Sequence, residues 1–370
     1  MSKSVSLNIN PLVLRWAREE SGYTIPEAVN KLDVQEATYL EWEKTGSNIP
    51  FSVLKHLAGI YRRQIAVFFL PKTPPKTKKP TDYRNIRLLS AKLSSKTLLS
   101  IRRVDKFRDF LLELNGDAYY RDKYDWLSKY DSVFKNFPLF HEDTTLWLRE
   151  IFNYSLDDQV NDGSPEDSYT NWRNAFENDL GIYTFQFSLP PSEIQGFCYS
   201  DNFPFCIAVN SKYPVSSRIF TLFHELGHIL KKQSGLCIPD DIDDAESIEF
   251  ECNSFAGRVL LPDHVMVSTI GKEEIYKRAR KLKVSSEVYL RRLRSLDLVS
   301  NDEFFRILEE IRRSIKPSKG FGISTPLQKS LNSRGQALFN SVLDALNKNI
   351  ISYSHASDIL ELKINHLIST

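Results

Sequence analysis

The pentapeptide His224–His228, with the sequence His-Glu-Leu-Gly-His, places the tightest constraint on how this chain of 370 residues can fold. Its surroundings predict a helix over residues 218–232, with Ser216 and Ser217 as candidate N-terminal caps and lysines at the negative end. This helix is apolar almost all round. The pentapeptide is therefore expected in a low-dielectric interior, where polar groups need partners.

His224 and His228 lie one turn apart on one face of the predicted helix. Two imidazoles at this spacing converge on one metal ion, and Glu225, rotated by about 100° from His224, can reach a water molecule held there. A single buried histidine is more often a hydrogen-bonded core residue. The full His-Glu-x-x-His pattern is rare in a chain with seven histidines, so we favour a hydrolytic metal site.

A third protein ligand is needed, because catalytic zinc usually takes three and leaves one position for water. No histidine follows at short spacing, since the next one is His264. The acidic residues downstream are Asp240, Asp241, Asp243, Asp244, Glu246, Glu249 and Glu251. On a helix predicted over residues 245–261, Glu249 faces inward and Glu251 faces water. We choose Glu249, with Asn253 one turn on as a partner for a ligand imidazole or for the Glu249 carboxylate. The alternative is an ordinary amphipathic helix with a half-buried glutamate.

The fold class predicted is α+β and predominantly helical. A chain of this length exceeds one compact core, and the stretch 70–80 breaks regular structure with four prolines. The predicted parts are a helix-turn-helix domain at 8–70, a linker at 71–82, a helical connector at 83–180, a core with the metal site at 181–315, and, after a Gly/Ser/Pro break at 316–322, a C-terminal helical unit at 323–370 whose helices begin near Ser333.

Two strands are predicted just before the motif helix. Residues 181–188 alternate aromatic with polar side chains, and residues 205–210 form a short apolar run. They indicate a small sheet in the core. Because the second strand directly precedes the motif helix, we expect it to offer an edge to an extended substrate segment.

The N-terminal part predicts four or five short helices. The first begins at Pro11 and stops at Ser21-Gly22, and the others cover 24–32, 35–43 and 52–69. A short turn at Asp33-Val34 favours a helix-turn-helix, although a plain helical bundle fits the pattern as well. The third helix would present Gln35, Glu36, Thr38, Tyr39 and Glu41 to the major groove. Residues 7–70 carry seven basic and seven acidic side chains, so any DNA binding is expected to be weak.

Composition excludes other classes of protein. The net charge of +2 gives no global case for nucleic acid or membrane surfaces, and no apolar run is long enough to cross a bilayer. The N-terminus lacks an export signal, which makes a cytoplasmic location the expectation. The four cysteines, Cys198, Cys206, Cys237 and Cys252, show no C-x-x-C spacing and are expected to be buried free thiols.

The motif region resembles the ImmA/IrrE family of bacterial and phage metallopeptidases. The resemblance rests on the sequences Thr221–His228, Glu249–Ala256 and Leu260-Leu-Pro262, and it extends upstream to 196–199 and 207–211. Residues 42–43 and 58–70 are similar to the repressor-like helix-turn-helix domain that many members carry. One departure is Cys252, where relatives usually have alanine.

The resemblance implies a gluzincin-like site in which His224, His228 and Glu249 bind Zn²⁺ and Glu225 is the general base. It further implies an endopeptidase that cleaves a helix-turn-helix repressor or a related regulatory protein and thereby switches on phage, mobile-element or stress-response genes. The expected partner is accordingly a protein substrate.

Two other functions remain open from the sequence. One is a DNA-binding transcriptional regulator or antitoxin-like protein whose peptidase module is vestigial or senses metal. The other is an interaction role for the N-terminal domain, which would dock the substrate or a sensor partner. The balanced charge of residues 7–70 makes docking of a protein the better interpretation.

Overall fold

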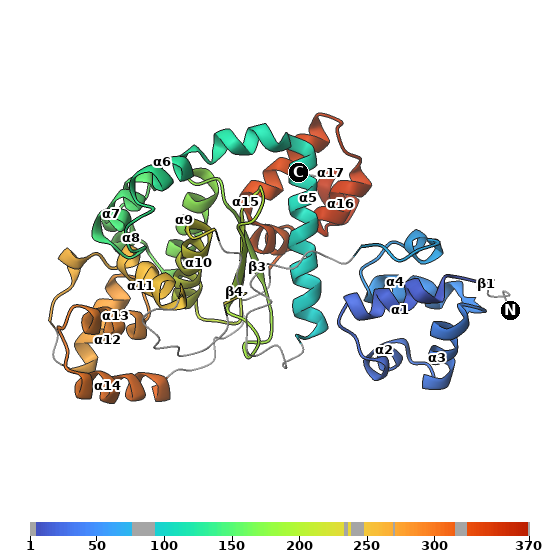
Figure 1. Cartoon of the computed structure of the whole chain (residues 1–370), viewed down its shortest axis with the longest axis horizontal. Coiled ribbons are helices and arrows are strands. Elements are labelled where there is room, and N and C mark those ends of the chain that lie inside the picture. The colour runs from blue at the N-terminus through green and yellow to red at the C-terminus, as the bar shows by residue number, and fades with distance from the viewer. Residues whose placement is uncertain are drawn as a thin grey trace. The chain divides into compact units, whose positions relative to one another are not determined.

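The computed structural model describes residues 5–75, 93–232, 236–237, 248–268, 271–314 and 324–368. Its helices far outnumber its strands, which confirms the α+β, predominantly helical class (Figure 1). The described residues up to Asp105 form one compact unit, and those from Lys106 onward form another. The five-part division remains a prediction, and the end of the linker (76–82) and the break at 316–322 lie outside the described residues.

The first unit is a small helical bundle with one two-stranded sheet. Its elements are β1 (Ser6–Leu7), α1 (Pro11–Glu20), α2 (Ile25–Leu32), α3 (Glu36–Thr45), β2 (Ile49–Pro50), α4 (Phe51–Ile60), the 3₁₀ helix η1 (Ile65–Phe69) and the start of α5 (Ser95–Lys123). Pro11 occupies the first position of α1 as expected, and Thr24 with Glu27 forms a capping box on α2. The single helix expected over 52–69 is wrong, because the chain turns through Arg62 at φ 52°.

Tyr39 corrects the expected DNA-facing surface of α3. Its side chain is fully buried, and its hydroxyl lies 3.0 Å from Oε1 of Glu43 and 2.6 Å from the hydroxyl of Tyr61. Arg18 Nε donates to the same Glu43 oxygen over 2.7 Å. Tyr39 therefore belongs to a buried polar network and cannot face a groove, whereas the other four residues named for that face are exposed. A role in DNA binding stays a prediction.

The second unit is built around a four-stranded sheet. Helices precede it, namely the rest of α5, α6 (Asp125–Val133), α7 (Glu142–Ile151), α8 (Leu156–Asn161) and α9 (Pro165–Asn178). The sheet and its helices follow as β3 (Tyr183–Phe187), β4 (Gly196–Tyr199), β5 (Cys206–Asn210), α10 (Val215–Leu230), β6 (Leu236–Cys237), α11 (Ile248–Leu260) and η3 (Asp263–Val265). Then come α12 (Lys272–Lys281), α13 (Ser286–Ser295), α14 (Asn301–Ser314), α15 (Pro326–Asn347), α16 (Tyr353–Leu360) and α17 (Ile364–Ile368). The last helical unit thus begins at Pro326, earlier than the expected Ser333.

The strand order is β3-β5-β4-β6, with β3 parallel to β5 and β4 antiparallel to both β5 and β6. The two strands predicted from the sequence are present. The edge predicted for residues 205–210 is wrong, because β5 is hydrogen-bonded to a strand on each side. Strand β4 was missed, since four residues are too few to show a clear alternation.

Both faces of this sheet are covered. Figure 1 shows α9 and α10 on one side of the sheet and α15 on the other. On β3, the ring of Phe185 packs 5.3 Å from that of Phe107 in α5, while Thr184 and Gln186 accept hydrogen bonds from Arg173 of α9 and Arg218 of α10. Helix α10 packs against β4 and β5 on one side and against α11 on the other.

No helix in the part of the chain that the structure describes has the length and apolar character needed to cross a membrane.

Candidate metal centre

The motif helix α10 begins at Val215 and ends at Leu230. Pro214 precedes it without a side-chain hydrogen bond, so the predicted caps Ser216 and Ser217 are wrong and lie inside the first turn. His224, Glu225 and His228 are each at most 1% exposed. The expectation that the pentapeptide enters the interior is confirmed, since the sheet covers one side of α10 and α11 the other.

Three donor groups converge between α10 and α11. Nε2 of His224 lies 3.2 Å from Oε2 of Glu249, and Nε2 of His228 lies 3.2 Å from Oε1 of the same carboxylate. The two Nε2 atoms are 3.1 Å apart. One donor atom of each residue lies within 4.8 Å of the others. Two imidazole nitrogens and a carboxylate facing one another are a donor set that fits a divalent cation.

The charges in this cluster depend on burial and on the contacts within it. Burial raises the pKa of Glu249, but hydrogen bonds with His224 and His228 outweigh that effect and hold its pKa below the ordinary value. Burial lowers the pKa of His228, but its contacts with Cys252 and Glu249 leave that pKa well above the ordinary value. The contacts with the two imidazoles thus favour the charged form of the Glu249 carboxylate.

Helix α11 supplies an outer partner as well as the carboxylate. Oδ1 of Asn253 lies 2.9 Å from Nδ1 of His224. This is one of the two roles expected for Asn253, and it leaves the Nε2 atom of His224 directed at the cluster. The predicted start of this helix and the acidic residues before it, Asp240, Asp241, Asp243, Asp244 and Glu246, lie outside the described residues.

Glu251 corrects the expected difference between the two glutamates of α11. Its side chain is 27% exposed and that of Glu249 is 31% exposed, so Glu251 does not face water more than Glu249 does. An ion pair with Lys231, just after α10, holds Glu251 on the protein. The two carboxylates therefore differ in what they contact: Glu249 meets the imidazoles, and Glu251 meets a lysine.

Glu225 is fully buried, and neither of its carboxylate oxygens has a regular hydrogen-bond partner within the described residues. Burial raises its pKa to about 7, against the lowering effect of the two imidazoles and of the Cys198 thiol. A Cβ atom added to Gly196 would lie 3.0 Å from Oε1 of Glu225. The sequence did not point to Gly196 and Cys198 as neighbours of Glu225. Residues two apart share a face of a strand, but this signal requires that β4 be recognised first.

Residues 177–294 match the model of the family Peptidase_M78, the IrrE N-terminal-like domain. The matched segment runs from the end of α9 to α13 and contains the sheet, α10 and α11. This match supports the resemblance to the ImmA/IrrE family and indicates a metallopeptidase-like function. No curated protein and no solved structure matches the chain.

Side chains from α7, α8 and α13 hold the C-terminal end of α11. The last two carbonyls of the helix and the carbonyl that follows them accept hydrogen bonds: Val259 from Arg149 over 2.6 Å, Leu260 from Gln159 over 3.5 Å, and Leu261 from Arg292 over 3.1 Å. Cationic donors suit this end of the helix, where the carbonyls concentrate negative charge.

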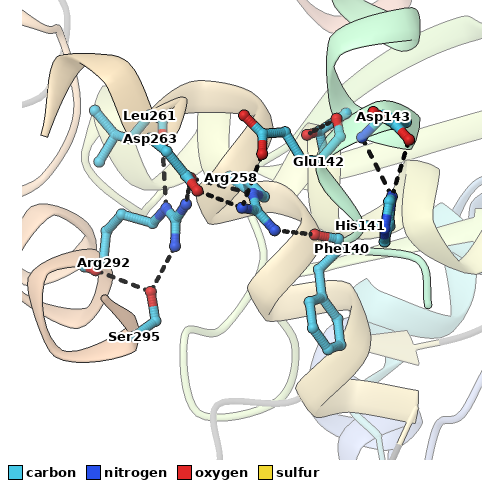
Figure 2. Close-up of polar contacts among 10 residues, drawn as sticks. Phe140, His141, Glu142, Asp143, Arg258, Leu261, Asp263, Arg292 and Ser295 are labelled. Carbon is cyan, nitrogen blue, oxygen red and sulfur yellow. Dashed lines mark hydrogen bonds and ion pairs between the residues drawn. The ribbon is translucent and has the colours of Figure 1, made fainter. Parts of the chain in front are cut away.

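Arg258 adds a second anchor for α11. Figure 2 shows its guanidinium between the carbonyl of Phe140, to which it donates over 2.8 Å, and the carboxylate of Asp263, which also pairs with Arg292. The ring of Phe140 meets that of Phe250, the neighbour of Glu249, at 6.1 Å. These contacts fix the direction of the helix that carries Glu249.

Three of the cysteines, Cys198, Cys206 and Cys252, are buried thiols that form no disulfide, as expected. The side chain of Cys237 lies outside the described residues.

Proposed function

We propose that this protein is a zinc-dependent endopeptidase in which His224, His228 and Glu249 hold the ion and Glu225 is the general base. One observation carries the proposal: three donor groups converge beside a fully buried carboxylate that has no regular hydrogen-bond partner among the residues that the structure describes. A buried polar atom without a hydrogen-bond partner destabilises the folded protein, and such atoms are commonly kept where a function requires them. Zinc is preferred for its affinity and availability, although a site of two histidines and a glutamate binds several divalent ions.

The residues divide the chemistry between them. A zinc ion held by His224, His228 and Glu249 would supply Lewis acidity, which would acidify a water molecule and polarise a peptide carbonyl. Glu225 takes a proton from that water as its oxygen attacks the carbonyl carbon, and it returns the proton to the nitrogen of the leaving amine. In the metal-free protein, burial raises the pKa of this carboxyl group to about 7. Asn253 keeps the imidazole of His224 oriented meanwhile.

The substrate that we propose is a cytoplasmic helix-turn-helix repressor or a related regulatory protein, whose cleavage derepresses phage, mobile-element or stress genes. The resemblance to the ImmA/IrrE family supports this choice. Residues 7–70 carry seven basic and seven acidic side chains, and this even balance suits docking of the substrate or a sensor better than tight binding of DNA.

The rival function is a DNA-binding regulator whose peptidase module only senses metal. Purified full-length protein, loaded with one equivalent of zinc, should be incubated with the repressor-like protein encoded beside its gene. Mass spectrometry should then find two fragments from one internal cleavage, and a chelator should abolish them. Stoichiometric zinc binding with an intact repressor would favour the metal-sensing function instead.

A further inference from the structure

The two imidazoles of the metal centre differ in what stands behind them. Both direct Nε2 at Glu249, so in a metal-bound state the remaining proton of each ring lies on Nδ1. A metal-bound histidine almost always donates this proton to an acceptor, which fixes the orientation of the ring. Nδ1 of His224 has Asn253 Oδ1 at 2.9 Å. Nδ1 of His228 has no partner of regular hydrogen-bond geometry within the described residues.

The side chain that approaches the His228 ring is Cys252. It precedes Asn253 on α11, is 0% exposed, and its side chain interacts with that of His228. Bulk water cannot easily reach this ring as an alternative acceptor, because His228 is only 1% exposed. One turn of α11 therefore carries three side chains that lie close to the two imidazoles. Glu249 faces both Nε2 atoms, Asn253 faces Nδ1 of His224, and Cys252 is the candidate partner for Nδ1 of His228.

Gly227 makes room for the thiol. A Cβ atom at Gly227 would lie 2.9 Å from Sγ and 3.2 Å from Cβ of Cys252, closer than real Cβ contacts come. The missing side chain of Gly227 thus leaves room for the cysteine of α11, and this packing holds Sγ against the residue that precedes His228.

We propose that Cys252 is a positioning residue for His228, with its sulfur accepting the Nδ1–H of the imidazole whose Nε2 binds the metal. This inference rests on the proposed metal site. Sulfur is a weak acceptor but a polarizable one, and in a dry interior a weak acceptor is preferable to none. The thiol therefore orients the ring without entering the coordination shell.

The test compares Cys252→Ala, which removes the acceptor, with Cys252→Ser, which replaces it by a hydroxyl of similar size. Cys206→Ala is the matched control, since that thiol is equally buried but lies on β5 and contacts the Pro204 carbonyl. Zinc affinity of the full-length proteins is measured by competition with a chromophoric chelator. Urea unfolding of the metal-free proteins shows whether each variant keeps its fold.

We expect Cys252→Ala to bind zinc roughly 10–100-fold more weakly than the wild type, whereas Cys252→Ser and Cys206→Ala stay within a few-fold of it. In ¹⁵N-resolved histidine spectra of the zinc-loaded protein, the His228 Nδ1 proton should exchange with water faster in the alanine variant only. Equal affinity of Cys252→Ala and the wild type, or equal loss in the alanine and serine variants, would overturn the role of Cys252. A wild-type protein that binds no zinc would refute the metal site itself.

Discussion

Oδ1 of Asn253 lies 2.9 Å from Nδ1 of His224, which joins α11 to the imidazole at the centre of α10. Because this contact decides which ring nitrogen carries the proton, we expect Asn253→Ala to weaken zinc binding by roughly 10–100-fold. Asn253→Asp keeps an acceptor at the same place and should retain most of the affinity. Isothermal titration of both variants with zinc measures the difference, and identical affinities for all three proteins would contradict it.

Glu225→Gln should separate metal binding from catalysis. Zinc content should stay near one per chain, because the three proposed ligands are untouched. The rate of peptide cleavage should fall by about 10²–10⁴-fold, since an amide cannot accept the proton from water. Metal analysis and cleavage are measured on the same preparation. Full activity in this variant would rule out Glu225 as the base.

Glu249→Ala and Glu251→Ala form a matched pair on one helix, with similar exposure but different contacts. The first removes the carboxylate that faces both imidazoles, so zinc occupancy should collapse. The second removes only the ion pair with Lys231, which is partly screened by solvent and should matter little for the metal. Dialysis against buffered zinc followed by elemental analysis decides between them, and equal losses would show that the wrong ligand was chosen.

Gly196→Ala tests how β4 accommodates the proposed base. The added Cβ would lie 2.6 Å from Cγ2 of Thr221, 2.9 Å from the Ala208 carbonyl and 3.0 Å from Oε1 of Glu225. We expect a loss of about 1–3 kcal/mol in the free energy of unfolding, as for other overpacked sites. Cleavage should slow more than zinc affinity falls, because Glu225 moves while the ligands do not.

Gly257→Ala is the control for that substitution. A Cβ atom there meets nothing within 4 Å, and the residue lies inside α11. It should stabilise the protein by about 0.5–1 kcal/mol, because glycine is costly in a helix. Urea midpoints of both variants provide the comparison. A stabilised Gly196→Ala protein would show that β4 can shift to accommodate the added Cβ, against the prediction.

DNA binding by the full chain should be weak and tolerant of sequence. Glu36 and Glu41 are exposed on α3, and carboxylates there repel phosphates. Titration with duplexes from the locus of its gene at physiological salt should give dissociation constants no tighter than about 10⁻⁶ M, the range of non-specific binding. Nanomolar affinity with a steep salt dependence would favour the regulator function.

The pentapeptide determined much of the candidate centre by its spacing alone. Residues four apart on a helix share a face whatever surrounds them, so the convergence of His224 and His228 was predictable. The apolar character of that helix predicted its burial for the same local reason. The identity of Glu249 came from helical periodicity on α11, and the contact of Asn253 with an imidazole followed from one further turn.

Contacts between distant segments were decided only by the tertiary structure. Helical periodicity separates inward from outward faces, but Glu251 shows that a residue predicted to face outward can pair with a lysine that follows another helix. In the same way, Tyr39 looked available on α3 until its hydroxyl was found between Glu43 and Tyr61. Gly196 on β4 and Glu225 on α10 are 29 positions apart in the chain, and no local pattern encodes their approach. Backbone geometry repeats along a sequence, whereas side-chain packing between elements depends on how they are brought together.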